Sequence, residues 1–422
     1  MPISRETKLV DNEPHATELK LRWRDRLACR AYEHLPTAAE IALKKCFPYV
    51  LPFASLRVPI SILRGPVGSG GNSGAVLVAG AGEGINYLTS RFFGGEYEKE
   101  ILGKVPLWNL SRTLRSLRSS TDLTIARVDK LSSGLLFGKD YLAAPEWVGS
   151  ILKVPENLKE LSKGNPSLKF DLKTVRLNGI TTEISEKEED CEEFCRTMYV
   201  PLIRKRYGEQ AFVRNIYWIR RVFRRGGLIW ARRHGHAVAG GVFQLRDKTL
   251  VFEILGTLGG EWEIVEEGGI AALYLFIINY AKKIGCKFIA LGGSRPSLTD
   301  GVLRYKRKWR VNLVEKKDAW YDFMVYWGEF NEKVAYFLSQ TPLIFRDQGG
   351  LSAIKVIDER VLVTGREAEK IRRSLWMPGL KSLYLFSSQD WKETEGSSPK
   401  TVLVDMTGRK GSDRWREGEI RI

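Results

Sequence analysis

Short apolar runs, bounded by glycine, proline or charged residues, recur along the chain and predict a protein rich in strands. In the first third, four such runs are expected to be strands: 58–63, 74–79, 123–128 and 147–154. The Gly/Ser-rich segment 64–74 reads as a hairpin connection, because it lacks the Gly-Lys-Ser/Thr ending of a phosphate-binding P-loop. A first α/β domain ending near Lys169 is the simplest interpretation.

From about residue 174 the pattern alternates between strands and longer helical segments. The expected strands are 174–177, 228–233, 237–245, 250–255, 288–291, 311–315 and 320–327. The expected helices are 188–207, 216–225 and 269–284, and Gly226-Gly227 ends the second of them as a glycine cap. Together with a helix or tight turn after Asp300-Gly301, this gives the succession β-α-α-β-β-β-α-β-α-β-β of a second α/β domain.

The last ninety residues predict smaller elements. They are a helix at 331–340, a hairpin of 343–346 with 352–357, a helix from 367 to 375 and an apolar run at 383–386. From 387 onward the chain is polar, and we expect much of it to be mobile.

The composition fits a globular protein of two or three domains, with 43% hydrophobic residues among 422. The net charge of +17 favours an acidic partner such as RNA, a nucleotide-linked substrate or an anionic membrane surface, although a basic surface also serves solubility alone. The amino terminus has no apolar core, and the run 270–281 is too short to span a bilayer. We therefore expect a cytoplasmic protein with no transmembrane segment, and peripheral membrane contact stays open.

Five cysteines form no paired framework, which argues for reduced thiols. Cys191 and Cys195 are expected to lie on one face of a helix without binding zinc, because no histidine lies near them in the sequence. His234 and His236 flank Gly235 in an expected hairpin turn. No metal site is expected.

The stretch 288–310, FIALGGSRPSLTDGVLRYKRKWR, places reactive side chains just after the carboxyl end of a strand. In open α/β sheets, loops at that end form the ligand-binding crevice. Its Gly292-Gly293, Asp300-Gly301 and Tyr305-Lys306 with Trp309, and the order of elements around it, resemble GNAT acyltransferases of the FemAB/FemX-like and CelD-like branch. The resemblance is strongest over residues 173–327.

The resemblance implies an α/β (α+β) fold of two tandem GNAT-like domains. Each would be a mixed, mostly antiparallel sheet flanked by helices. The expected parts are a first domain at 1–169, a catalytic domain at 170–330, a segment at 331–386 that returns to the first domain, and a polar, partly mobile tail at 387–422.

The resemblance also implies site residues. Lys306 matches the lysine of the family's aromatic-lysine pair and is expected to stabilise a developing oxyanion, and Tyr305 lies where a tyrosine often serves as general acid. For an aromatic-basic run taken alone, the alternative is that Tyr305 packs in the core and Lys306 is solvated. The expected substrate-binding residues are Arg295, Asp300, Arg304, Arg307 and Lys308; the alternatives are a solvated basic face and, for Asp300, a turn signal.

The expected donor-binding residues are Gly268, Gly269, Ala271, Gly292 and Gly293. Ordinary GNAT enzymes bind the coenzyme A pyrophosphate at a helix amino terminus with Gln/Arg-x-x-Gly-x-Gly/Ala, but here the leading position is Glu266 and further glutamates surround it. FemX-like enzymes use aminoacyl-tRNA instead. Basic residues that could follow an RNA backbone, or be ordinary helix surface, are Arg204, Lys205, Arg206, Arg214, Arg220, Arg221, Arg224 and Arg225.

We therefore expect an acyltransferase that moves an acyl or aminoacyl group, with acyl-CoA or acetyl-CoA as donor, to an amine or hydroxyl of a small-molecule, glycan or peptide acceptor by direct attack. One alternative is an aminoacyl-tRNA-dependent transferase of cell-envelope synthesis. Another is a non-catalytic GNAT-like protein that binds RNA or an anionic polymer.

Overall fold

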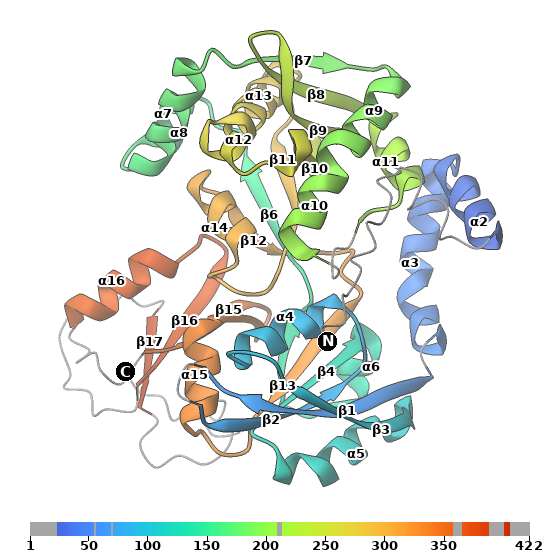
Figure 1. Ribbon diagram of the computed structural model, residues 1–422, viewed down its shortest axis with the longest axis vertical. Helices are drawn as coiled ribbons and strands as arrows, with labels where there is room; N and C mark the ends of the chain where they lie inside the picture. The colour runs from blue at the N-terminus through green and yellow to red at the C-terminus, as the bar shows by residue number, and fades with distance from the viewer. Residues whose placement is uncertain are drawn as a thin grey trace, which may run out of the picture. The chain divides into compact units, whose positions relative to one another are not determined.

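The computed structural model describes residues 23–54, 56–68, 71–208, 213–357, 365–387 and 401–405 (Figure 1). The chain divides into two compact units, each built from two separate segments. Unit 1 is Met1–Thr37 with Lys169–Lys287, and unit 2 is Ala38–Leu168 with Phe288–Ile422. The predicted domain boundaries stay predictions, although one unit boundary falls beside the predicted boundary at 169. The predicted polar tail lies almost wholly outside the described residues.

Unit 1 is built on four antiparallel strands in the order β10-β9-β8-β7. Their bounds are β7 Thr181–Ser185, β8 Gly226–Arg233, β9 His236–Arg246 and β10 Thr249–Thr257. Its helices are α2 Trp23–Glu33, α8 Pro166–Leu177, α9 Glu188–Phe194, the π-helical turn Cys195–Tyr199, α10 Val200–Tyr207, α11 Ile216–Phe223, the 3-10 turn Leu258–Gly260, α12 Glu263–Glu266 and α13 Gly269–Lys283.

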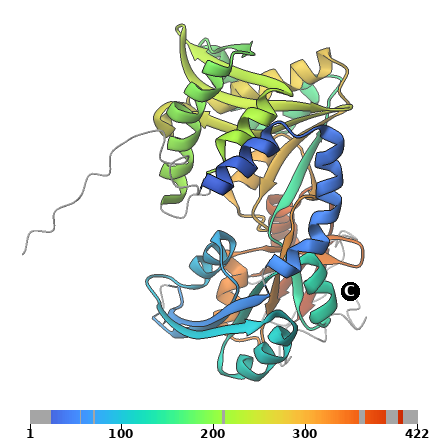
Figure 2. The same ribbon diagram turned by 90° about the vertical axis from the view of Figure 1, so that its right-hand side faces the viewer.

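Strands β8, β9 and β10 are buried along most of their length. Because successive side chains point to opposite sides of a sheet, both faces of this sheet are covered. On one face Trp230 and Val242 pack with Cys191, Cys195 and other buried residues of the segment from α9 to α11. On the other face the rings of Phe243 and Phe252 pack edge-on against Tyr280 and Tyr274 of α13. Figure 2 shows helices on both sides of the strands of this unit.

Unit 2 holds the remaining strands. They are β1 Arg57–Pro66, β2 Ser73–Ala79, β3 Glu98–Pro106, β4 Leu123–Asp129, β5 Leu142–Pro145, β6 Val148–Lys153, β11 Phe288–Ser294, β12 Asn312–Glu315, β13 Tyr321–Tyr326, β14 Leu343–Asp347, β15 Gly350–Val356, β16 Leu380–Ser387 and β17 Thr401–Asp405. Its helices are α3 Thr37–Ala54, α4 Glu83–Phe92, α5 Leu110–Leu117, α6 Lys130–Leu136, α7 Leu158–Ser162, α14 Gly301–Lys308, α15 Glu332–Gln340 and α16 Gly365–Leu375, with 3-10 turns at Leu107–Asn109 and Arg118–Ser120.

The main sheet of unit 2 has the order β3-β1-β2-β4-β13-β5, in which only β2 and β4 are parallel. Strands β14, β15, β16 and β17 form a second sheet in that order, and β6 pairs antiparallel with both β11 and β12. One apolar core joins β2 and α4 to α15, β14, β15 and β16, and a second core lies between the other face of the main sheet and α5. The expectation of a mixed, mostly antiparallel α/β protein with helices on its sheets is confirmed.

One predicted strand is wrong. Residues 174–177 lie in helix α8, because the helical signals before them outweigh a short apolar run. The Asn165 side chain accepts a hydrogen bond from the Leu168 backbone N–H, Pro166 opens the helix, and Gly179 ends it with φ of 56°. Strand β7 takes the place of the missing strand, so the predicted order of elements holds.

Among the described helices, none combines the length and the apolar character needed to cross a membrane.

Candidate active site

The predicted box folds as strand β11, a loop and helix α14, all within unit 2. The Asp300 side chain accepts a hydrogen bond of 3.0 Å from the Leu303 backbone N–H and thereby caps α14. Gly292 has φ of 59°, a left-handed conformation that favours glycine. Trp309, at the end of the helix, is buried. The Asp300-Gly301 turn signal and the helix after it are confirmed.

The Lys306 ammonium group ties α14 to the end of β11. Lys306 is 4% exposed, and its Nζ donates to the carbonyl oxygens of Gly292 at 3.2 Å and Gly293 at 3.0 Å. A third bond of 3.1 Å goes to Ser294 Oγ. The reading of Lys306 as a solvated side chain is therefore wrong. An ammonium group has three donors, and these three bonds take up all of them.

This arrangement limits what Lys306 can do in catalysis. An oxyanion would have to replace one of the bonds to the loop before Nζ could stabilise it. The same bonds turn the two glycine carbonyls toward the lysine and fix the path of the chain from β11 to α14. The catalytic roles of Lys306 and Tyr305 stay predictions.

The other predicted residues of α14 have different surroundings. Tyr305 is half-buried, and the Lys308 ammonium lies 4.6 Å from the centre of its ring. Arg304 is exposed, whereas the Arg307 side chain donates to the carbonyl of Ser374. Burial, reinforced by the nearby charge of Arg304, lowers the pKa of Arg307. The basic residues of this helix thus do not form one solvated face.

Arg295 lies in the loop between β11 and α14 and belongs to a cluster of partly buried charges. Its guanidinium lies 3.4 Å from Glu83 and 3.7 Å from Glu146, and its side chain is 11% exposed. Arg127, on β4, makes two hydrogen bonds to Glu146, of 2.9 and 3.0 Å. Glu83 is the more accessible of the two carboxylates, with 32% of its side chain exposed against 9% for Glu146. Two guanidinium groups and two carboxylates therefore meet beside the loop.

An aromatic ring lies against each arginine of this cluster. The Arg295 guanidinium lies 3.9 Å from the ring centre of Trp147, and that of Arg127 lies 3.5 Å from Tyr321. Burial, with the nearby charge of Asp300, raises the pKa of Tyr87 to about 12. The Tyr87 hydroxyl is therefore protonated at neutral pH.

Sequence reasoning missed the segment that completes this cluster, Gly80-Ala81-Gly82-Glu83-Gly84, which runs from the end of β2 into the first turn of α4. Gly80 and Gly82 have φ of 92° and 127°. A Cβ on Gly84 would lie 2.4 Å from the Phe323 ring and 2.8 Å from Glu146, so only glycine fits there. Three glycines in five residues, between an apolar run and a helix, are a signal that could have revealed this segment.

The predicted donor residues Gly268, Gly269 and Ala271 belong to unit 1, at the start of α13. Gly268 has φ of 95°, and a Cβ there would lie 3.1 Å from Val175 Cγ2 and 3.2 Å from the Val175 backbone nitrogen. The Asn178 side chain donates to the Glu267 carbonyl at 2.8 Å. Helix α8 and the residue after it therefore pack closely on this turn, and close packing is a sufficient reason for glycine at 268.

The glutamates around that turn are engaged locally. Glu261 pairs with Lys205, Glu266 accepts a hydrogen bond of 3.1 Å from the Trp262 indole, and Glu267 lies 2.5 Å from Arg233. A pyrophosphate at this helix terminus would meet three carboxylates, although their partners offset part of the charge.

Three of the basic residues suggested for RNA make contacts within unit 1. Arg221 is buried, and it donates to the backbone carbonyls of Tyr32 and Glu33. Arg220 pairs with Glu192, and Arg224 pairs with both Glu33 and Glu188. These side chains hold α2, α9 and α11 together, so they do not make a continuous free cationic track.

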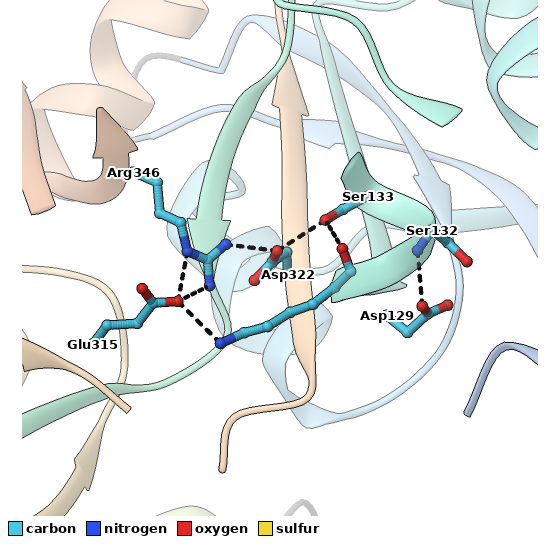
Figure 3. A network of polar contacts seen from close by, with 7 residues as sticks. Asp129, Ser132, Ser133, Glu315, Asp322 and Arg346 are labelled. Atoms are coloured by element: carbon cyan, nitrogen blue, oxygen red, sulfur yellow. Dashed lines mark hydrogen bonds and ion pairs between the residues drawn. The ribbon is translucent and has the colours of Figure 1, made fainter. Parts of the chain in front are cut away.

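A second charged network in unit 2 has a structural role. The Arg346 guanidinium contacts Asp322 at 2.6 Å and Glu315 at 2.7 Å, and Lys130 contacts Glu315 at 3.0 Å (Figure 3). Ser133 Oγ donates to the buried Asp322 carboxylate at 3.0 Å. The network ties β12, β13, β14 and α6 together. Among the described residues, no group of three or more His, Cys, Asp or Glu side chains is arranged to hold a metal ion.

Comparison with solved structures finds proteins of similar fold. FemX is 12% identical over 68% of this chain and 96% of its own, with a TM-score of 0.34. L-PGS from Bacillus licheniformis is 12% identical over 66% of this chain and 87% of its own, with a TM-score of 0.31. A tandem GNAT protein from the clavulanic acid biosynthesis pathway is 10% identical over 61% of this chain and 79% of its own, with a TM-score of 0.26.

No family model and no curated protein matches the sequence. The chain is similar in fold to FemX and to tandem GNAT proteins. At these TM-scores the similarity concerns the fold alone, not individual residues or chemistry.

Proposed function

We propose that the chain is a transferase that moves an acyl or aminoacyl group from an activated donor to an amine or hydroxyl by direct attack. The observation that supports this most is the mutual contact of the parts of the box. The Lys306 ammonium binds both glycine carbonyls that end β11, and Asp300 caps the helix that carries Lys306. Residues of the motif that are apart in the sequence therefore contact one another and fix the loop between β11 and α14. Arg295, in this loop, lies beside two carboxylates.

The cluster offers the groups that such a transfer needs. The attacking amine or hydroxyl must lose a proton, and Glu83 is a carboxylate with access to solvent that lies against Arg295. We assign Glu83 as the proton acceptor and Arg295 as the cation that orients it. In the reaction the nucleophile attacks the acyl carbon and Glu83 takes its proton. The bond between the acyl carbon and the donor's leaving group breaks, and the leaving group departs with the electron pair. Tyr305 is the proposed source of the proton that the leaving group takes up.

The donor we propose first is an acyl-CoA. A second candidate, aminoacyl-tRNA, is favoured by the carboxylates and the close packing of Val175 at the turn before α13, where a coenzyme A pyrophosphate was expected. Both donors occur in the cytoplasm, so a cytoplasmic location stays part of the proposal. The acceptor is proposed to be a small molecule, a glycan or a peptide that presents an amine or hydroxyl.

A turnover assay with variants of Glu83 tests the proposal. Purified protein is given labelled acetyl-CoA, longer acyl-CoAs or aminoacyl-tRNA with mixed amine and hydroxyl acceptors, and transfer is measured. Glu83→Gln should lower kcat by about a hundredfold, because it removes the proton acceptor and keeps the shape. Glu100→Gln, at an exposed site on β3, should retain full turnover. Unchanged kcat in Glu83→Gln would remove Glu83 from the reaction, and no transfer from any donor by folded protein would contradict the proposed function.

A further inference from the structure

Unit 2 contains a polar cavity that the proposed transfer does not use. Its volume is about 560 Å³, within the roughly 300–1,000 Å³ typical of small-molecule sites. It lies where β1 ends, where β2 and β4 begin and where β13 ends. Its charged lining residues are Arg64, Arg115, Arg118, Lys333, Asp122 and Glu329.

Of the two acidic residues that line the cavity, Asp122 is engaged by the protein itself. The two oxygens of Asp122 accept hydrogen bonds from the Ala75 backbone N–H at 2.8 Å and from Asn331 Nδ2 at 2.9 Å. Lys333 lies 3.2 Å from the same carboxylate. Asp122 thus joins β2, β4 and α15 and has its negative charge balanced. The other acidic lining residue, Glu329, is exposed.

The three arginines give the side chains that line the cavity a net positive charge. Arg64 and Arg115 are exposed and come from different elements, β1 and α5. Arg118 is held more firmly, because it binds Asp140 at 2.7 Å and its guanidinium lies 3.8 Å from the ring centre of Tyr326. The bond to Asp140 is made by Nη1, one of the three nitrogens that carry the five N–H donors of this guanidinium.

We propose that this cavity binds the phosphate or pyrophosphate group of a small molecule. Guanidinium groups from three elements can contact several oxygens at once, and a phosphate or pyrophosphate offers more oxygens and more charge than a carboxylate. Ser73 and Ser119 add hydroxyl groups to the wall. The proposal does not depend on the proposed transferase function.

Calorimetric titration with inorganic pyrophosphate, at low and moderate salt, tests the cavity. Wild-type protein should bind one pyrophosphate saturably. The double variant Arg64→Gln/Arg115→Gln should bind at least about tenfold more weakly, because two charge-assisted contacts are lost. The matched control is Arg112→Gln, an exposed arginine on the same helix α5 that does not line the cavity, and it should bind as wild type does.

Absence of saturable binding to folded wild-type protein would overturn the proposal, and so would equal weakening in the double variant and the control. Glu83→Gln should bind pyrophosphate normally, so the two proposals can fail separately. Tighter binding of adenosine diphosphate than of pyrophosphate, lost in the double variant, would support the proposal and identify a nucleotide as the ligand.

Discussion

Two glycine pairs beside helices were predicted to bind the donor, and the structure gives them opposite surroundings. Gly292-Gly293 turns its carbonyls toward a buried lysine and leads to an arginine among carboxylates. Gly268-Gly269 lies under Val175 and among glutamates. The same Gly-Gly pattern therefore has two roles. In unit 2 its carbonyls accept hydrogen bonds from Lys306, an arrangement we call the lysine clamp, and in unit 1 it allows close packing. The role of each glycine pair is decided by the residue that the fold brings against it, Lys306 for one pair and Val175 for the other.

The largest effect is expected from Lys306→Met, which keeps the apolar part of the side chain and removes the ammonium group of the lysine clamp. Two carbonyl groups and one hydroxyl would lose their donor in a buried site, so we expect the free energy of unfolding to fall by about 2–4 kcal/mol. Transfer activity should fall at least tenfold in protein that is still folded, because the loop that holds Arg295 is no longer fixed.

Lys308→Met is the matched control for that experiment. It lies on the same helix but contacts the ring of Tyr305, so its effect on stability should stay below about 1 kcal/mol. Denaturant unfolding compares the two variants. Equal stabilities would show that the bonds made by Lys306 contribute little.

The packed turn is tested by Gly268→Ala. The positive φ alone should cost about 1–2 kcal/mol, and contact with Val175 should add to this. Gly285→Ala separates the two effects, since Gly285 has φ of 72° and nothing within 4 Å of an added Cβ. If thermal unfolding shows equal losses in both variants, packing against Val175 is not a reason for glycine at 268.

The smallest effect is expected from Glu266→Gln, at an exposed position. Stability should change by less than about 0.5 kcal/mol. Affinity for acyl-CoA, measured by calorimetry, should rise about twofold to fivefold, because one like charge near the expected pyrophosphate is removed. Glu193→Gln, exposed on α9, should leave this affinity unchanged. An unaltered affinity in Glu266→Gln would mean that no pyrophosphate binds near this helix.

The periodic pattern predicted most strands and the long helices, because those elements are specified by local alternation and by caps. It failed at α8, where a capping asparagine and a proline outweighed a short apolar run. The burial of Lys306 could not be predicted, since it depends on where the end of β11 lies relative to α14. The same is true of the cluster of Arg127, Glu146 and Arg295, whose members are far apart in the sequence.

The strand partners in unit 2 have a consequence for synthesis of the chain on the ribosome. Asp129 of β4 pairs with Tyr321 of β13, and Val148 of β6 pairs with Ser294 and Glu315. These β4 and β6 positions are translated long before their partners, with all of residues 169–287 in between. In the nascent protein the edges of these strands stay without their partners until β11, β12 and β13 are made. During that time strands of other chains can pair with them. Slow translation before residue 326 would lengthen the time that these edges stay unpaired, so chaperone binding should matter most for unit 2.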